Sequence, residues 1–178
     1  MLREVRDRAK RMEVEVPCVH ANLVQLEGLS DASCDHGMCL FSTLGMIHGR
    51  EHRTTALRHF RRIIKPNGTL VLHVHNYWYN LFDPGGPWWL FGNLIASGWS
   101  QTFGNGKLER GDKHYPYRGL QNMFLHVFPR GEIQASLQAA GWTNLEFIPL
   151  RPVSLQPWHE PAWFKSIRTV GWVIVCRS

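Results

Sequence analysis

His75 and Asn76 are the residues of this sequence best placed to carry out chemistry. They directly follow residues 69–74, a β-branched and apolar run that predicts a buried strand. In open α/β sheets, ligands bind beyond the carboxyl ends of the strands. A histidine at that place can accept a proton near neutral pH or orient a substrate. A histidine at a strand end is also often only a hydrogen-bonded part of the structure, and the sequence leaves both interpretations open.

Two other predicted strands end in residues that could contact a ligand. Residues 14–20 alternate well enough for a short edge strand, since Pro17 cannot donate a ladder hydrogen bond, and Asn22 follows them. Residues 37–41 form the apolar centre of a second strand, predicted to be covered on both faces, and the segment 41–46 follows. The plainer alternatives are that Asn22 caps its own turn and that residues 41–46 only connect a strand to a helix.

The segment 48–52 matches the zinc-peptidase string H-x-x-E-H. That motif needs a well-supported helix and a third ligand, whereas Gly49 stands where a helix is expected to begin. The surrounding pattern also belongs to a different kind of fold. We therefore predict no metal site in this sequence.

Helix and strand patterns alternate along the chain, which indicates an α/β fold. Helices are predicted over residues 1–12, 51–64 and 130–140, and the second carries an outer face of arginines. A turn at residues 66–68 and a stop at Gly141 separate these helices from the strands that follow. Further strands are predicted over residues 143–150 and 169–176. The arginines placed on the outer face are Arg53, Arg58, Arg61 and Arg62.

Residues 77–124 form an aromatic-rich insertion with weak periodicity and one short helix predicted over residues 88–96. The segment contains four tryptophans and several glycines and prolines. Loops of this length in compact domains are often functional. The insertion could be a lid over an apolar acceptor, a satellite core beneath a long loop, or a patch that binds a partner.

The order of these elements resembles a Rossmann-like, class I S-adenosylmethionine-dependent methyltransferase. The resemblance covers nearly the whole of residues 1–178 as a single, partial domain. It rests on the order and spacing of four motifs, each weak alone. They are the helix with Leu2, Ala9 and Lys10; Cys-Val-His-Ala-Asn-Leu at 18–23; Cys-Asp-His-Gly-Met at 34–38 with Arg-Ile-Ile-Lys-Pro-Asn-Gly-Thr-Leu at 62–70; and Ala-Ala-Gly-Trp at 139–142.

The resemblance implies S-adenosyl-L-methionine as cofactor, a small-molecule methyl acceptor, and helices on both faces of a sheet ordered 3-2-1-4-5-7-6. It places the insertion after the fifth strand. His75 and Asn76 would then be the catalytic residues. It also implies that the chain is N-terminally truncated, beginning after the first two strands and the Gly-rich cofactor loop, so cofactor binding is expected to be weak. The implied cofactor-binding residues are Asn22, Leu23, Phe41, Ser42 and Leu44, and the implied substrate-binding residues are Met46, Tyr77 and Trp78.

Composition sets the remaining expectations. A charged content of 19% and an apolar content of 44% indicate a globular protein. The formal charge of +6 keeps a nucleic-acid methyltransferase open, although no RNA-binding motif is present. A non-catalytic remnant or interaction module of the same fold is the other alternative. The cysteine spacing predicts buried, reduced thiols. We expect a cytoplasmic protein, because the sequence shows no signal peptide and no membrane-spanning run.

Overall fold

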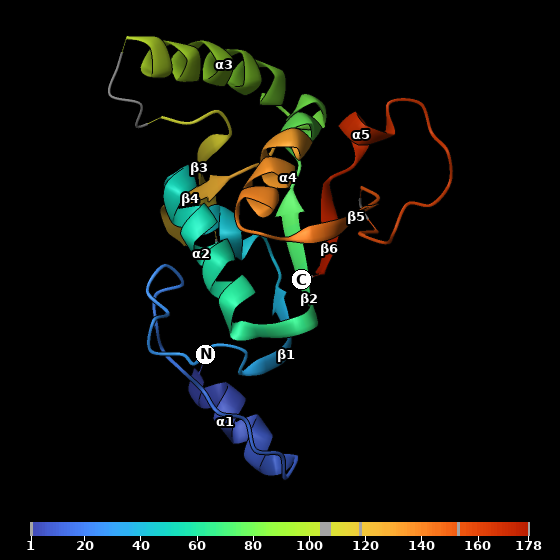
Figure 1. Ribbon diagram of the computed structural model, residues 1–178. Helices are drawn as coiled ribbons and strands as arrows, with labels where there is room; N and C mark the ends of the chain where they lie inside the picture. Colours follow the sequence, from blue (N-terminus) through green and yellow to red (C-terminus); the bar gives the residue numbers. More distant parts are fainter. Residues whose placement is uncertain (1, 104–107, 118, 153, 178) are drawn as a thin grey trace.

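The computed structural model describes residues 2–103, 108–117, 119–152 and 154–177. Met1 and residues 104–107 and 118 of the predicted insertion lie outside the described residues. The elements in chain order are α1 (Leu2–Arg11), β1 (Cys34–Cys39), η1 (Thr43–Met46), α2 (Arg50–Ile63), β2 (Ile64–His75), η2 (Tyr77–Phe82), α3 (Gly86–Thr102), β3 (Asp112–Tyr117), β4 (Leu120–His126), α4 (Arg130–Ala139), β5 (Thr143–Pro149), α5 (Lys165–Arg168) and β6 (Gly171–Arg177) (Figure 1).

A four-stranded sheet ordered β1-β2-β6-β5 forms the centre of the molecule (Figure 1). β1 and β2 are parallel and are connected through α2, which agrees with the strand, helix and strand predicted in this part of the chain. β6 enters between β2 and β5 and is antiparallel to both. If β1 and β2 are the fourth and fifth strands of the expected order, β6 and β5 take the places of the seventh and sixth.

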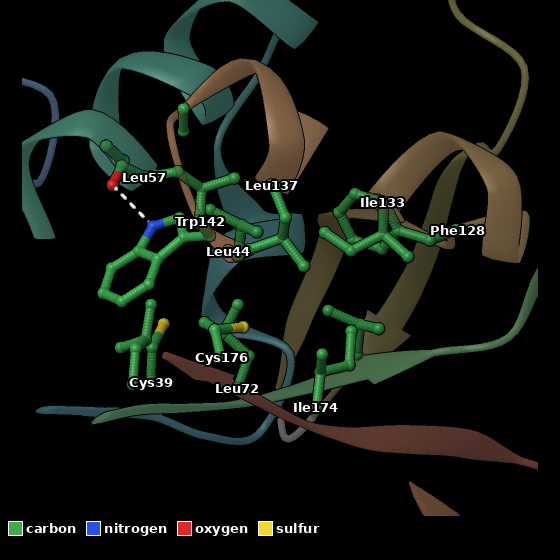
Figure 2. Packing of buried hydrophobic residues seen from close by; sticks show 14 of the residues in the cluster. Cys39, Leu44, Leu57, Leu72, Phe128, Ile133, Leu137, Trp142, Ile174 and Cys176 are labelled. Atoms are coloured by element: carbon green, nitrogen blue, oxygen red, sulfur yellow. Dashed lines mark hydrogen bonds between the residues drawn. The ribbon is translucent and has the colours of Figure 1, made fainter. Parts of the chain in front are cut away.

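Helices α2 and α4 pack side by side on one face of this sheet and close the main core. β2 alternates, with Leu70, Leu72 and Val74 directed into the core and the intervening residues half-buried. Trp142, at the corner before β5, is buried and donates its indole N–H to the carbonyl of Leu57 at 3.1 Å (Figure 2). The predicted Gly-Trp corner therefore joins α2 to the end of α4.

Two predictions about the first strands are wrong. Residues 14–20 form no strand, because β1 stands at the sheet edge and no described strand offers them backbone partners. β1 was expected to be covered on both faces, yet Met38 is 77% exposed because no described element packs over that side. The two helices of the core cover one face only, so the expected second layer is not seen among the described residues. Cys34, on the same strand, is also exposed, unlike buried Cys39 and Cys176.

The predicted turn at residues 66–68 lies at the start of β2 as an irregularity in the β1–β2 register. Asn67 has a left-handed backbone, with φ of 65°. Gly68 is required for close approach, because a Cβ there would lie 2.4 Å from the carbonyl oxygen of Asp35. The turn therefore sets the register in which β2 meets β1.

The predicted insertion is more regular than its sequence suggested. Its helix α3 is 17 residues long, and β3 and β4 form a separate antiparallel hairpin that the weak periodicity did not reveal. No helix in the described part of the chain is long and apolar enough to cross a bilayer.

Candidate functional site

A pocket of about 330 Å³ lies at the carboxyl end of β2, where His75 and Asn76 were expected to act. Its walls come from the strand end, from η2, from the β3–β4 hairpin and from the residue before β6. Aromatic, apolar and polar side chains are mixed in it. The lining residues are His75, Asn76, Tyr79, Asn80, Asp83, Lys113, Tyr115, Leu125, Val127 and Val170.

His75 is held neutral by its surroundings. Burial lowers its pKa below the ordinary 6.5, and the positive charge of Lys113 lowers the pKa further, while the backbone of Val170 acts in the opposite direction. His73 lies edge-on to His75 with ring centroids 5.0 Å apart, and burial lowers its pKa to about 4. A neutral imidazole can accept a proton, so His75 has the ionisation state that a general base needs.

Asn76 is buried and is fully engaged with the backbone around it. Its amide nitrogen donates to the carbonyls of Ser166 at 2.9 Å and Thr169 at 2.8 Å, and its oxygen accepts from the N–H of Trp78 at 3.1 Å. These bonds fix the end of β2 to the segment that leads into β6. The structure thus places Asn76 at the pocket wall with a positioning role, and its catalytic role stays a prediction.

The segment after β1 runs beside the end of β2. Phe41 and Ser42 are consecutive left-handed residues, with φ of 56° and 55°, and Phe41 is 83% exposed. Ser42 is buried, and its hydroxyl accepts a long hydrogen bond from the N–H of His75 at 3.4 Å. Leu44 points into the main core, whereas Met46 is exposed. Of the predicted cofactor residues here, only Phe41 therefore presents a large surface to a ligand.

The remaining predicted site residues do not line the pocket. Asn22 accepts a hydrogen bond from the N–H of Val24 at 3.2 Å, which is the turn-capping arrangement, and Leu23 packs against the main core. Tyr77 and Trp78 belong to a second apolar cluster, with the guanidinium of Arg110 4.9 Å and 5.2 Å from their ring centroids. The structure brings His75, Asn76 and Ser42 together, and it does not bring Asn22 or Leu23 to them.

A buried ionic cluster next to the pocket was missed in the sequence. His126, at the end of β4, lies between Asp112 at 2.8 Å from Nδ1 and Glu132 at 2.9 Å from Nε2. Arg53 contacts Glu132 at 3.3 Å and Glu109 at 2.5 Å. Its side chain is only 2% exposed, so its assignment to the outer face of α2 is wrong. Its ion pairs with two partly buried glutamates, Glu109 and Glu132, hold it in the interior.

The ionisation of this cluster is the reverse of that around His75. Burial alone would lower the pKa of His126, but hydrogen bonds to Asp112 and Glu132 outweigh it and raise the pKa above its usual range. The same two bonds hold the pKa values of both carboxyls below their usual range against the effect of burial. Glu109, Asp112 and His126 could together hold a metal ion, but Arg53 already supplies a cation to Glu109.

The cluster also supports the segment after β1. Gly45 lies so close to β4 that a Cβ there would be 2.5 Å from the carbonyl oxygen of His126. The five residues of the cluster come from α2, the β3–β4 hairpin and α4, up to 79 positions apart in sequence. No local pattern could have revealed it, apart from a histidine inside the apolar run of residues 125–128.

Comparison with known proteins agrees with this geometry. Residues 1–72 match a family model described as a methyltransferase domain. A search of curated proteins finds no match. The chain superposes on a Methanosarcina mazei S-adenosylmethionine-dependent methyltransferase with a TM-score of 0.60, at 15% identity and over 88% of its own length. Its fold is that of the class I S-adenosylmethionine-dependent methyltransferases.

Two further methyltransferase structures are similar over nearly the whole chain. One is the Burkholderia thailandensis 1,6-didemethyltoxoflavin-N1-methyltransferase, with bound 1,6-didemethyltoxoflavin and S-adenosylhomocysteine (TM-score 0.57, 14% identity, 98% of this chain). The other is CcbJ of Streptomyces caelestis (TM-score 0.57, 18% identity, 100% of this chain). The chain spans 64% of the M. mazei methyltransferase, 56% of the B. thailandensis one and 75% of CcbJ.

Proposed function

We propose that this protein is an S-adenosylmethionine-dependent methyltransferase that acts on a small molecule. The observation that carries the proposal is a neutral histidine, His75, in a pocket at the carboxyl end of a strand whose sheet has the methyltransferase order. The family-model match over residues 1–72 supports it independently. No feature of the described residues favours a non-catalytic module or a nucleic-acid methyltransferase over this function.

His75 would act as the general base. When bound, S-adenosylmethionine supplies an activated methyl group on a sulfonium, so the protein has to align the acceptor and remove its proton. His75 is neutral and lines the pocket. The hydroxyl of Ser42 accepts from the backbone N–H of His75, and the side chain of Asn76 anchors the next residue of the chain to Thr169. The proton of an acceptor hydroxyl or amine would pass to the imidazole as the methyl group arrives.

The pocket favours a flat acceptor with an aromatic part. Tyr79 and Tyr115 contribute aromatic walls, and Leu125 and Val127 contribute apolar ones. Aromatic rings bind other rings well in such surroundings. Lys113 brings a positive charge to the same wall and donates to the side chain of Asn80 at 2.7 Å.

The residues present fit the cofactor in part. Exposed Phe41, at the carboxyl end of β1, offers an aromatic surface beside the open edge of the sheet, and we propose that it contacts the cofactor. Asn22 and Leu23 remain proposed cofactor contacts. The described residues contain no counterpart of the Gly-rich loop or of the ribose-binding carboxylate that the resemblance implies.

Calorimetric titration with S-adenosylhomocysteine tests the cofactor part, and transfer of a labelled methyl group to a panel of phenols and aromatic amines tests the reaction. We expect binding that weakens on Phe41→Ala, and transfer that is lost on His75→Gln. Met38→Ala is the matched control for Phe41, because it alters a similarly exposed side chain three positions earlier, on β1. Absence of both binding and transfer would contradict the proposal.

A further inference from the structure

Helix α3 packs against the protein with its polar side. The positions that it buries are Gly86, Leu90, Asn93 and Ser97, of which only Leu90 is a large apolar residue. Asn93 accepts from the N–H of Gly111 at 3.0 Å and donates to the carbonyl of Asp112 at 3.2 Å. Leu90 and half-buried Trp89 add a short apolar contact with the second apolar cluster, so α3 is attached partly by hydrogen bonds and without the long buried apolar stripe of most surface helices.

The opposite side of α3 is apolar and exposed. Trp88, Phe91, Ile95 and Trp99 are 56–81% exposed. Their spacing of three, four and four residues places them in one stripe along the helix. Helix α3 contains no Asp, Glu, Lys, Arg or His. An exposed apolar surface of this extent marks an interaction site in soluble proteins.

Further exposed apolar residues lie on neighbouring segments at the same end of the molecule. Helices α3 and α5 both contact η2, beyond the carboxyl end of β2 (Figure 1). Exposed apolar residues occur on α3, on η2 and at the two positions directly before α5, and we call them together the aromatic surface. It comprises Leu81, Phe82, Trp88, Phe91, Leu94, Ile95, Trp99, Trp163 and Phe164. Lys165 and Arg168 follow directly on α5.

The chemistry of the aromatic surface fits a lipid bilayer better than another protein. Protein interfaces carry about one hydrogen bond per 100–200 Å², whereas the stripe on α3 offers only indole N–H groups. Tryptophans stand near both ends of the stripe with Phe91 and Ile95 between them, and indole rings favour the boundary between headgroups and acyl chains. Because the opposite side of α3 is attached to the protein through Asn93, the helix would lie along that boundary and not across it.

Charge complementarity selects the kind of bilayer. Lys165 and Arg168, on α5, directly follow Trp163 and Phe164 of the aromatic surface, and α3 itself carries no acidic residue. Basic residues next to a membrane are attracted to anionic headgroups. We propose that the aromatic surface docks this protein onto an anionic phospholipid bilayer, with α3 lying in the interface. This inference does not depend on the methyl-transfer activity.

Flotation with vesicles of phosphatidylcholine and phosphatidylglycerol at a ratio of about 3:1 tests the proposal, with the partition coefficient as readout. We expect the unaltered protein to float with the vesicles, and the double variant Trp88→Ser, Trp99→Ser to lose at least tenfold in partition coefficient. Val19→Ser with Met38→Ser is the control, because both side chains are exposed and lie outside the aromatic surface. That variant should partition like the unaltered protein.

A second variant, Phe91→Ser with Ile95→Ser, keeps the test valid if loss of the tryptophans affects folding, which circular dichroism would reveal. It should also lose at least tenfold. Failure of the unaltered protein to bind these vesicles, or undiminished binding by both folded variants, would overturn the proposal. A third result would also overturn it: a protein that is a dimer in sedimentation equilibrium, does not bind vesicles, and becomes a monomer on the Trp88 and Trp99 substitutions. In that case the aromatic surface would bind a second copy of this chain.

Discussion

His75 and His126 stand at the ends of neighbouring strands and occupy opposite environments. His75 ends β2 beside a pocket, with another histidine and a lysine as its electrostatic neighbours. His126 ends β4 in a buried site, with a carboxylate on each ring nitrogen. Burial lowers the pKa of the first, whereas paired carboxylates raise the pKa of the second in spite of burial. The number of carboxylates in contact decides the charge.

The two environments suit the two histidines to different roles, proton transfer for His75 and structural support for His126. A neutral ring that reaches a cavity can accept a proton. A protonated ring held between Asp112 and Glu132 cannot, but it joins the β3–β4 hairpin to α4. Arg53 extends the same cluster to α2. The hairpin that walls the pocket is thereby fixed to the helices that cover the sheet.

The largest expected effect comes from His75→Gln. Loss of a general base typically costs about 10²–10⁴-fold in rate. We therefore expect kcat for methyl transfer to fall by roughly that factor, with little change in the unfolding free energy, because the side chain has no carboxylate partner. The exposed His159→Gln should leave kcat unchanged. A rate within threefold of the unaltered protein for His75→Gln would remove His75 from the reaction.

The next largest effect is expected from His126→Ala. Removing one partner of a buried ionic cluster typically costs about 3–5 kcal/mol, because the remaining charges lose their compensation. Urea denaturation should show a loss of unfolding free energy of that size, against less than about 0.5 kcal/mol for His159→Ala. Equal effects of the two substitutions would show that the cluster does not support the fold.

A smaller effect is expected from Asn76→Ala, next to the proposed base. The variant leaves the carbonyls of Ser166 and Thr169 without their donor, which costs about 1–3 kcal/mol for buried groups. Thermal and urea denaturation measure this loss. If kcat at equal folded fraction also fell by more than tenfold, the predicted catalytic role of Asn76 would be supported in addition to its positioning role.

The smallest effect is a pH dependence of stability. His73 and His75 have lowered pKa values, so the unfolded chain binds their protons first as the pH falls below 6.5. Stability should therefore decrease as the pH falls from 6.5 toward 5, by on the order of 1 kcal/mol for these partly buried rings. The variant His73→Gln should show a shallower decrease. The raised pKa of His126 acts oppositely, and its contribution is lost as the pH rises through that value.

The sequence predicted the parts of the molecule that depend on local patterns. The strands at β1, β2, β5 and β6, the helices α1, α2 and α4, and the corner at Trp142 follow from periodicity and stop signals. The order of the four observed strands followed from the resemblance, as the 4-5-7-6 part of the expected sheet. His75 could be placed at a pocket because a strand end is a local feature.

Features that depend on distant partners could not be predicted in this way. The strand expected over residues 14–20 would need a neighbouring strand, which none of the described residues supplies. Arg53 has the sequence context of an exposed residue and is buried only because Glu109 and Glu132 meet it. The orientation of helix α3 could not be predicted for a similar reason. Its exposed stripe has the apolar composition of a face that usually packs into the core.

The most direct test of the opposite ionisation of the two histidines is a proton NMR titration of the histidine Cε1–H resonances, assigned through His75→Gln and a conservative His126→Gln variant. We predict that His75 titrates with a midpoint below 6.5 and His126 with a midpoint above 6.5. A common midpoint near 6.5, or the reverse order, would contradict the assigned roles of His75 as the proton acceptor and His126 as a structural cation.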